Sequence, residues 1–140
     1  MGYMLDTNAC IHLLTERYPE YQRRVLENLE ALPSDVPVLL SSVVVFELSY
    51  GVKKSRWRKA NQEVLREFLL DFQICSFDES AALIAGDVRA ELERKGTPIG
   101  PMDTLIAAHA LSLGVTLVSH NTDEFSRVKG LKLENWAEAQ

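Results

Sequence analysis

Three acidic side chains lie where short apolar stretches of the chain end or where a helical pattern begins. Asp6 ends the apolar stretch in "YMLDTN", Glu47 lies within "SSVVVFELSYG", and Asp103 opens "DTLIAAHAL". Carboxylates that meet in one place repel one another unless protons, basic groups or metal ions neutralise them. Divalent ions held by carboxylates can activate water and stabilise the leaving oxygen in phosphodiester cleavage. The three acids therefore indicate metal-dependent hydrolysis.

Further oxygen ligands follow the last apolar stretch, in "LVSHNTDEF". Asn121, Asp123 and Glu124 lie close together there. The sequence contains no cluster of His or Cys residues, so the ligands on offer are hard oxygen atoms. Such ligands suit Mg²⁺ or Mn²⁺ rather than zinc.

Each of the first three acids also has an ordinary structural interpretation. Asp6 can cap a helix, and Asp103 in a first helical turn gains ~0.3–1 kcal/mol from the helix dipole. Glu47 can be a partly exposed acid at the edge of a helix. If Ser42 caps that helix, however, Glu47 shares a face with Val43, Tyr50 and Gly51. An unpaired carboxylate on such a face is costly, which favours a bound metal or a partner.

Short apolar stretches alternate with segments of helical periodicity, which predicts an α/β domain with a short, mainly parallel central sheet flanked by helices. Strands are expected at 3–5, 36–40, 73–77 and 115–119. Helices are expected at 9–14, 18–32, 43–55, 59–72, 79–95 and 103–113. Pro101 and Gly114 suit the two ends of the last helix and place Asp103 in its first turn. Ligand sites of such sheets form at the carboxyl ends of the strands, so an acidic pocket is expected there.

The composition is that of one globular domain covering residues 1–140, with 46% apolar residues. No apolar run approaches the roughly 20 residues of a membrane-spanning helix, so a cytoplasmic protein without a membrane partner is expected. Cys10 and Cys75 lack metal-ligand spacing and are expected to be reduced thiols. The net charge of −5 argues against binding nucleic acid through overall charge. A local basic patch or metal ions must serve any such role.

A basic run, "KKSRWRK", extends from Lys53 to Lys59 and contains one aromatic residue. These residue types suit phosphate contacts and base stacking. A solvated helix end explains the same run, and the sequence leaves both interpretations open.

Four blocks of the sequence resemble the PIN-domain family, and specifically VapC-type toxins, the ribonuclease half of bacterial toxin–antitoxin pairs. They are "MLDTN", "SSVVVFELSYGV", "GTPIGPMDTLIAAHALSLGVTLVSHNTDEF" and "LENW". The resemblance implies a small α/β domain that cleaves RNA with Mg²⁺ or Mn²⁺ held by acids. It also implies a cognate antitoxin that blocks the site, a homodimer and a larger toxin–antitoxin assembly. The RNA target, for example a tRNA or an mRNA site, stays open.

By matching position, the resemblance places Asp6, Glu47 and Asp103 on the acidic, metal-binding and catalytic positions of the family. Asn8 and Ser42 fall on positions that support the site.

The sequence departs from the family pattern at the fourth acid. Many PIN domains have Asp where this chain has Asn121, whose neutral amide can contact a metal without contributing charge. In the VapC-type group, the acid of "NT-x-E-F" matches Glu124, and the neighbouring Asp123 is a further candidate. The number of metals, one or two, is therefore open.

Three other classes of protein also fit part of this sequence pattern. Phosphotransfer enzymes of the haloacid dehalogenase type need a second Asp where this chain has Asn8. Receiver-like domains need paired early acids and a late lysine, which are not evident in the expected form. A PIN fold that only binds RNA or protein is the third alternative, and the presence of Asp6, Glu47 and Asp103 speaks against it.

Overall fold

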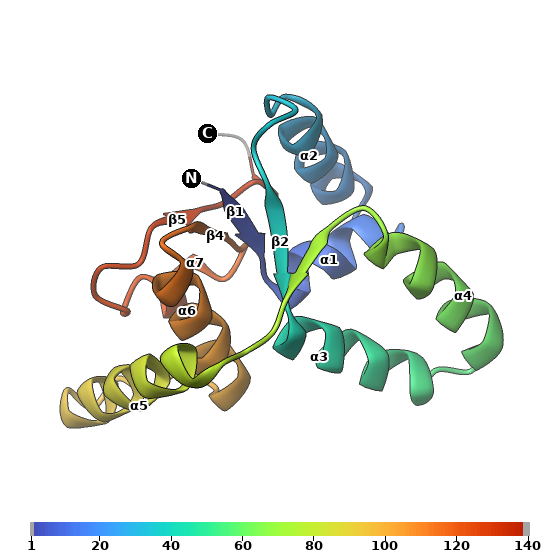
Figure 1. Cartoon of the computed structure of the whole chain (residues 1–140). Coiled ribbons are helices and arrows are strands. Elements are labelled where there is room, and N and C mark those ends of the chain that lie inside the picture. The colour runs from blue at the N-terminus through green and yellow to red at the C-terminus, as the bar shows by residue number, and fades with distance from the viewer. Residues whose placement is uncertain (1, 139–140) are drawn as a thin grey trace.

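The strands form a five-stranded parallel sheet in the order β3-β2-β1-β4-β5. A computed structural model describes residues 2–138, coloured along the chain in Figure 1. The strands are β1 (Tyr3–Leu5), β2 (Val38–Ser41), β3 (Gln73–Cys75), β4 (Thr116–Val118) and β5 (Leu133–Glu134). The predicted α/β class with a parallel sheet is confirmed. β5 was not predicted, because a two-residue strand has no periodicity to reveal it.

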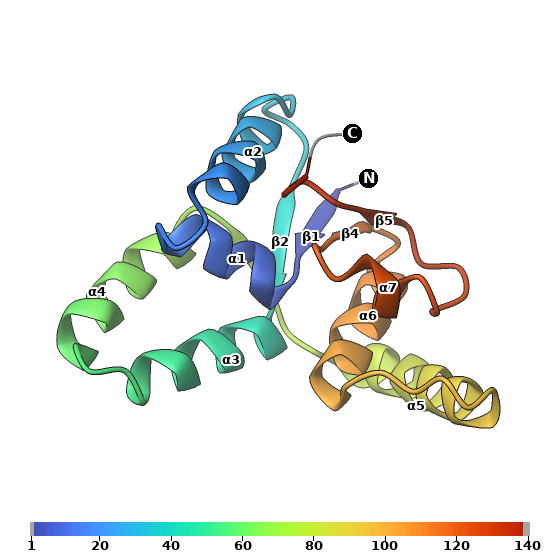
Figure 2. The same cartoon turned by 180° about the vertical axis from the view of Figure 1, so that it is seen from behind.

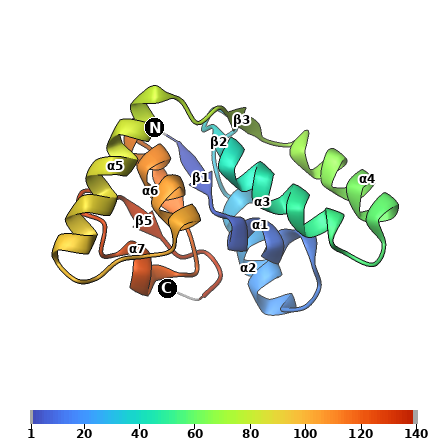
Figure 3. The same ribbon diagram turned by 90° about the horizontal axis from the view of Figure 1, so that it is seen from below.

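Helices cover both faces of the sheet. They are α1 (Thr7–Leu14), α2 (Pro19–Glu30), α3 (Ser42–Lys53), α4 (Arg58–Leu69), α5 (Glu79–Arg94), α6 (Pro101–Leu113) and α7 (Thr122–Phe125). Figure 3 shows α5 and α6 on one face, and α1 and α2 on the other. The six predicted helices are present with ends shifted by at most three residues. Within residues 2–138, no helix is long and apolar enough to cross a bilayer.

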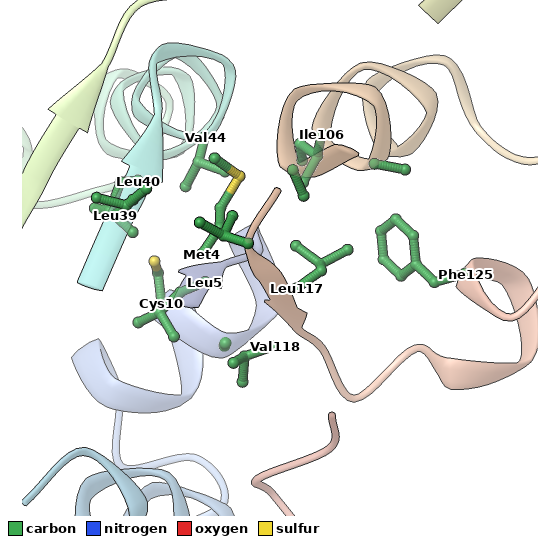
Figure 4. Packing of buried hydrophobic residues seen from close by; sticks show 14 of the residues in the cluster. Met4, Leu5, Cys10, Leu39, Leu40, Val44, Ile106, Leu117, Val118 and Phe125 are labelled. Atoms are coloured by element: carbon green, nitrogen blue, oxygen red, sulfur yellow. The ribbon is translucent and has the colours of Figure 1, made fainter. Parts of the chain in front are cut away.

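The central strands are apolar on both faces because helices pack on each side. Met4 and Leu5 of β1 and Leu117 of β4 are fully buried. Figure 4 shows Val44 of α3 and Ile106 of α6 on one side of these strands and Cys10 of α1 on the other. Burying a side chain of this size contributes about 1.5–3 kcal/mol. The core therefore holds the ends of β1 and β4 in fixed positions.

The ends of α6 follow the sequence prediction. Pro101 is its first residue, and Gly114 closes it in the left-handed conformation with φ 66°. A residue with a side chain adopts this conformation only with strain, which explains glycine here. Cys10 and Cys75 are unpaired, as expected.

Candidate functional site: an acidic cavity at the strand ends

The acidic cavity lies where the chain changes direction across the sheet. From β1 the chain proceeds to β2 and β3 on one side, and it later returns to β4 and β5 on the other side. A change of this kind leaves a crevice at the carboxyl ends of the two central strands. Figure 2 shows β1 leading into α1 and β2 leading into α3 at this end of the sheet.

Asp6 is the most buried of the acids, with 2% of its surface exposed. Its Oδ1 accepts a hydrogen bond from the Ala9 backbone N–H at 2.8 Å, which makes it the N-cap of α1. Its Oδ2 accepts a hydrogen bond of 2.5 Å from the Ser119 hydroxyl, just beyond β4. Burial raises the pKa of Asp6 to about 6, and the charges of Asp103 and Glu47 add to this rise against the two hydrogen bonds. Asp6 is thus both a helix cap and a member of an acidic cluster.

Glu47 reaches the same cavity from α3. It is partly buried, and its Oε1 accepts a hydrogen bond of 2.5 Å from the Thr7 hydroxyl at the start of α1. The face of α3 that carries Glu47 lines the cavity rather than the core, because Tyr50 on the same face is 60% exposed. The prediction that Glu47 lies on one helix face with Tyr50 is confirmed, and that face borders an open cavity.

Ser42 does not cap α3, so this detail of the sequence prediction is wrong. Ser41 is the N-cap, with its Oγ accepting from the Val43 N–H at 3.1 Å. The Ser42 hydroxyl instead accepts a hydrogen bond of 3.0 Å from the Phe77 N–H. Ser42 therefore ties the start of α3 to the segment after β3, whereas the exposed Asn8 lines the cavity itself.

Asp103 lies in the first turn of α6, as predicted. Burial, together with the charges of Glu124 and Glu47, raises its pKa to about 6. The Asn121 side-chain amide donates to Asp103 Oδ2 at 3.4 Å and to Glu124 Oε2 at 2.9 Å. Glu124 is thereby joined to Asp103 through a neutral bridge. Asp123 is exposed on α7, so of the two neighbouring acids it is Glu124 that is linked to the cluster.

These side chains surround a cavity of about 600 Å³. Its lining combines acidic, polar and apolar groups: Asp6, Thr7, Asn8, Ile11, Phe46, Glu47, Tyr50, Met102 and Asp103. Glu124 and Asn121 adjoin this lining through Asp103. The cavity is large enough to admit part of a polymeric substrate.

The chemistry of the cavity fits a hard divalent cation. Within residues 2–138, no Lys, Arg or His forms an ion pair with any of the four acids. The donors are oxygen atoms, which Mg²⁺ and Mn²⁺ prefer. The same part of the chain holds no three His, Cys, Asp or Glu side chains already arranged as a metal site. Thr7, Ser119 and Asn121 instead donate hydrogen bonds to the carboxylates. The carboxylates would therefore rotate to bind an ion.

Three contacts that support the site were not predicted from the sequence. Thr7 and Ser119 each donate to a site acid. The Ser41 hydroxyl lies 2.8 Å from His109 Nδ1, and this contact connects the start of α3 with the middle of α6. Ser119 follows β4 just as Asp6 follows β1. This shared position at the end of a strand could have indicated that Ser119 lies near Asp6. The Ser41 contact had no such signal, because its partner His109 lies in the middle of α6 and not at the end of a strand.

Asn121→Asp is expected to destabilise the protein in EDTA by about 1–3 kcal/mol, because two carboxylates lose a hydrogen-bond donor and gain a like charge. Urea unfolding in EDTA measures this loss, and millimolar Mg²⁺ should recover part of it. Asn8→Asp is the matched control, since Asn8 lines the cavity without bridging two acids. Equal stability of Asn121→Asp and the unaltered protein in EDTA would contradict the bridging role.

Comparisons with known proteins agree with this geometry. A sequence model described as "PIN domain" matches residues 3–131. The chain is 42% identical over 136 residues to "Ribonuclease VapC2" of Rickettsia felis, covering 97% of this chain and 98% of that protein. It is 37% identical, with the same coverage, to "tRNA(fMet)-specific endonuclease VapC" of Salmonella typhimurium.

A solved structure is similar over nearly the whole fold. It is "VapBC2 from Rickettsia felis bound to a DNA fragment from their promoter", with a TM-score of 0.89 and 40% identity over 97% of this chain and 99% of that chain. The chain therefore belongs to the PIN-domain family, whose nucleases are metal-dependent, and within it to the VapC ribonucleases.

Proposed function

We propose that this protein is the toxin of a toxin–antitoxin pair and that it hydrolyses RNA phosphodiester bonds at the acidic cavity. The observation that carries the proposal is the meeting of Asp6, Glu47 and Asp103 in one cavity without a basic partner among the described residues. An acidic cluster repels an RNA phosphate unless cations intervene, so the arrangement makes sense for a metal-dependent nuclease.

The acids have distinct roles in this proposal. Asp6, Glu47, Asp103 and Glu124 would hold Mg²⁺, or Mn²⁺, and Asn121 would add an amide oxygen or bind a ligand water. The cation supplies positive charge for the scissile phosphate and activates water. Thr7 and Ser119 fix the rotamers of Glu47 and Asp6 through their hydroxyl groups. Asn8 and Ser42 support the cavity from its lining and from the start of α3.

The partners follow from the relatives. The similar structure contains a VapBC pair on promoter DNA, so we propose a cognate antitoxin that blocks this cavity, a homodimer of the toxin, and a larger assembly of both chains. The relative from Salmonella typhimurium is named a tRNA(fMet)-specific endonuclease, which makes tRNA the first substrate to test. Residues 1–140 form one domain in this proposal, and the enzyme acts in the cytoplasm, where its RNA is found.

The test is cleavage of total cellular RNA by the purified, partner-free protein. Discrete fragments are expected with Mg²⁺ or Mn²⁺, none in EDTA, and none with Asp103→Asn. Asp123→Asn is the matched control, because Asp123 is an exposed neighbour of Glu124, and it should cleave normally. Cleavage that persists in EDTA or in Asp103→Asn would overturn the assigned chemistry. No cleavage of any RNA class by folded protein would favour a PIN scaffold that only binds.

A further inference from the structure

Two exposed aromatic rings follow Glu47 along the chain, and each has a cation against it. Tyr50 is 60% exposed, and Lys54 Nζ lies 5.0 Å from the centre of its ring. Trp57 is 67% exposed, and Arg56 Cζ lies 5.5 Å from the centre of its ring. Exposed aromatic rings with cations beside them are the combination that proteins use to stack nucleic-acid bases and to contact the backbone of a single strand. We call these four residues the α3 strip.

The α3 strip begins at the acidic cavity. Tyr50 lines the cavity together with Glu47. Glu47, Tyr50 and Lys54 are spaced by three and four residues, so they lie along one side of α3 and its C-terminal end. The turn that carries Arg56 and Trp57 follows directly, before α4 begins. Figure 3 shows α3 extending from the start of α1 out to this turn. The strip thus leads outward from the cavity.

The charge around the α3 strip is unbalanced. Residues 48–62 contain five Lys and Arg residues and no Asp or Glu, in a chain whose net charge is −5. Within the described residues, none of the five forms an ion pair, whereas Arg23, Arg66 and Arg89 each pair with a Glu of their own helix. All five are exposed. These cations are therefore available for an external anion.

We infer that the α3 strip binds single-stranded RNA and guides it into the acidic cavity, with Tyr50 and Trp57 stacking on bases and Lys54 and Arg56 contacting phosphates. The inference rests on the proposed function and names the part of the substrate that the enzyme holds beside the cleavage site. Rings can stack on bases only where the bases are unstacked, as in a single strand or a loop. Each ring of the strip has a cation beside it, and along a single strand each base likewise has a phosphate beside it.

The test measures binding rather than cleavage. A labelled single-stranded RNA of about 12 nucleotides, within the usual site size, is titrated into full-length protein carrying Asp103→Asn, so that the probe stays intact. Trp57→Ala is expected to weaken binding about ten-fold, the typical cost of one lost stacking contact. Joint replacement of Lys54 and Arg56 by Ala should lower the slope of log affinity against log salt by about 1.4, or about 0.7 for each lost phosphate contact.

Two controls share the exposure and charge of the altered residues. Leu83→Ala removes an apolar side chain that is also 67% exposed, and Lys129→Ala removes an exposed cation outside the strip. Both should bind the probe as the parent does. A duplex of the same sequence should bind without sensitivity to Trp57.

Unchanged affinity in Trp57→Ala and in the Lys54 and Arg56 variant overturns the inference, as does equal weakening in the two controls. Variants that bind RNA normally but fail to bind the antitoxin would also overturn it and assign the strip to the protein partner. Because binding is read without cleavage, an inactive enzyme leaves this result interpretable. Failure of the proposed function and failure of the strip are thus separate outcomes.

Discussion

Asp6→Asn is expected to abolish RNA cleavage while making the metal-free protein more stable. Cleavage should fall by more than about 100-fold, the upper end of the loss seen when a residue merely supports a metal ligand. The substituted amide keeps the size of the side chain and can still accept from the Ala9 N–H, so the cap of α1 is retained. Loss of activity would then reflect loss of charge rather than of fold.

The stability gain follows from the raised pKa of Asp6. With a pKa of about 6 in the folded state against 3.8 for an unperturbed Asp side chain, the folded protein binds more protons than the unfolded chain between about pH 4 and 6. The free energy of unfolding therefore falls as pH rises through this window, and the charged carboxylate costs up to about 3 kcal/mol above it. Asp6→Asn removes this cost and weakens the Ser119 hydrogen bond, for a net gain of about 2 kcal/mol at pH 7.5.

Thermal unfolding in EDTA from pH 4.5 to 7.5 measures this effect. A gain of about 2 kcal/mol should raise the Tm by about 6 °C at pH 7.5, with little difference at pH 4.5. Asp123→Asn, on the exposed side of α7, should leave both Tm and cleavage unaltered. In cells, expression without the antitoxin should arrest growth, and Asp6→Asn should relieve the arrest. A Tm of Asp6→Asn below that of the unaltered protein at pH 7.5 would argue that the hydrogen bonds outweigh the buried charge.

Phe125→Ala is expected to destabilise the protein by about 3–5 kcal/mol. Phe125 is fully buried, and Figure 4 shows its ring facing Leu117 and Ile106. Among the four residues of the short helix α7, Phe125 is the one that is buried. Removing the ring should release α7 from the core and displace the adjacent Glu124 from Asp103. Cleavage should therefore fall together with stability.

Urea unfolding provides the measurement. Phe125→Leu should lose less than the alanine variant because it refills part of the volume, and it should recover part of the activity. Leu83→Ala, at an exposed position, should change stability by less than about 0.5 kcal/mol. A loss below 1 kcal/mol in Phe125→Ala would mean that α7 is held by other contacts.

The sequence predicted the strands and helices well where apolar periodicity was long or an end signal was present. Pro101 and Gly114 fixed α6, and the position of Asp6 after the first strand indicated the site. What the sequence could not reveal were contacts between distant segments. The N-cap of α3 is Ser41 rather than Ser42, because the Ser42 hydroxyl accepts a hydrogen bond from the Phe77 backbone N–H, 35 residues away. Likewise, nothing local distinguishes a face of α3 that borders a cavity from one that borders the core.

The roles of Asp6, Glu47, Asp103 and Glu124 stay predictions, of which Asp6→Asn and Asp103→Asn test two directly and Phe125→Ala tests that of Glu124 indirectly. The structure adds the hydroxyl and amide donors that form hydrogen bonds with all four carboxylates. These donors are small polar residues, whose types are common at turns and helix starts. Their function depends on spatial neighbours, so residue type alone did not single them out.

The central position of β1 has a consequence for how the protein is made. Its first residues pair with β4, which is synthesised more than a hundred residues later, and Ser119 reaches back across 113 positions to Asp6. Contacts of such long sequence separation form late, after the intervening loops have closed. A nascent chain still lacking β4 therefore has neither the Ser119 contact nor Glu124 in place. Activity should therefore emerge only after β4 and Glu124 have been synthesised and have folded onto β1.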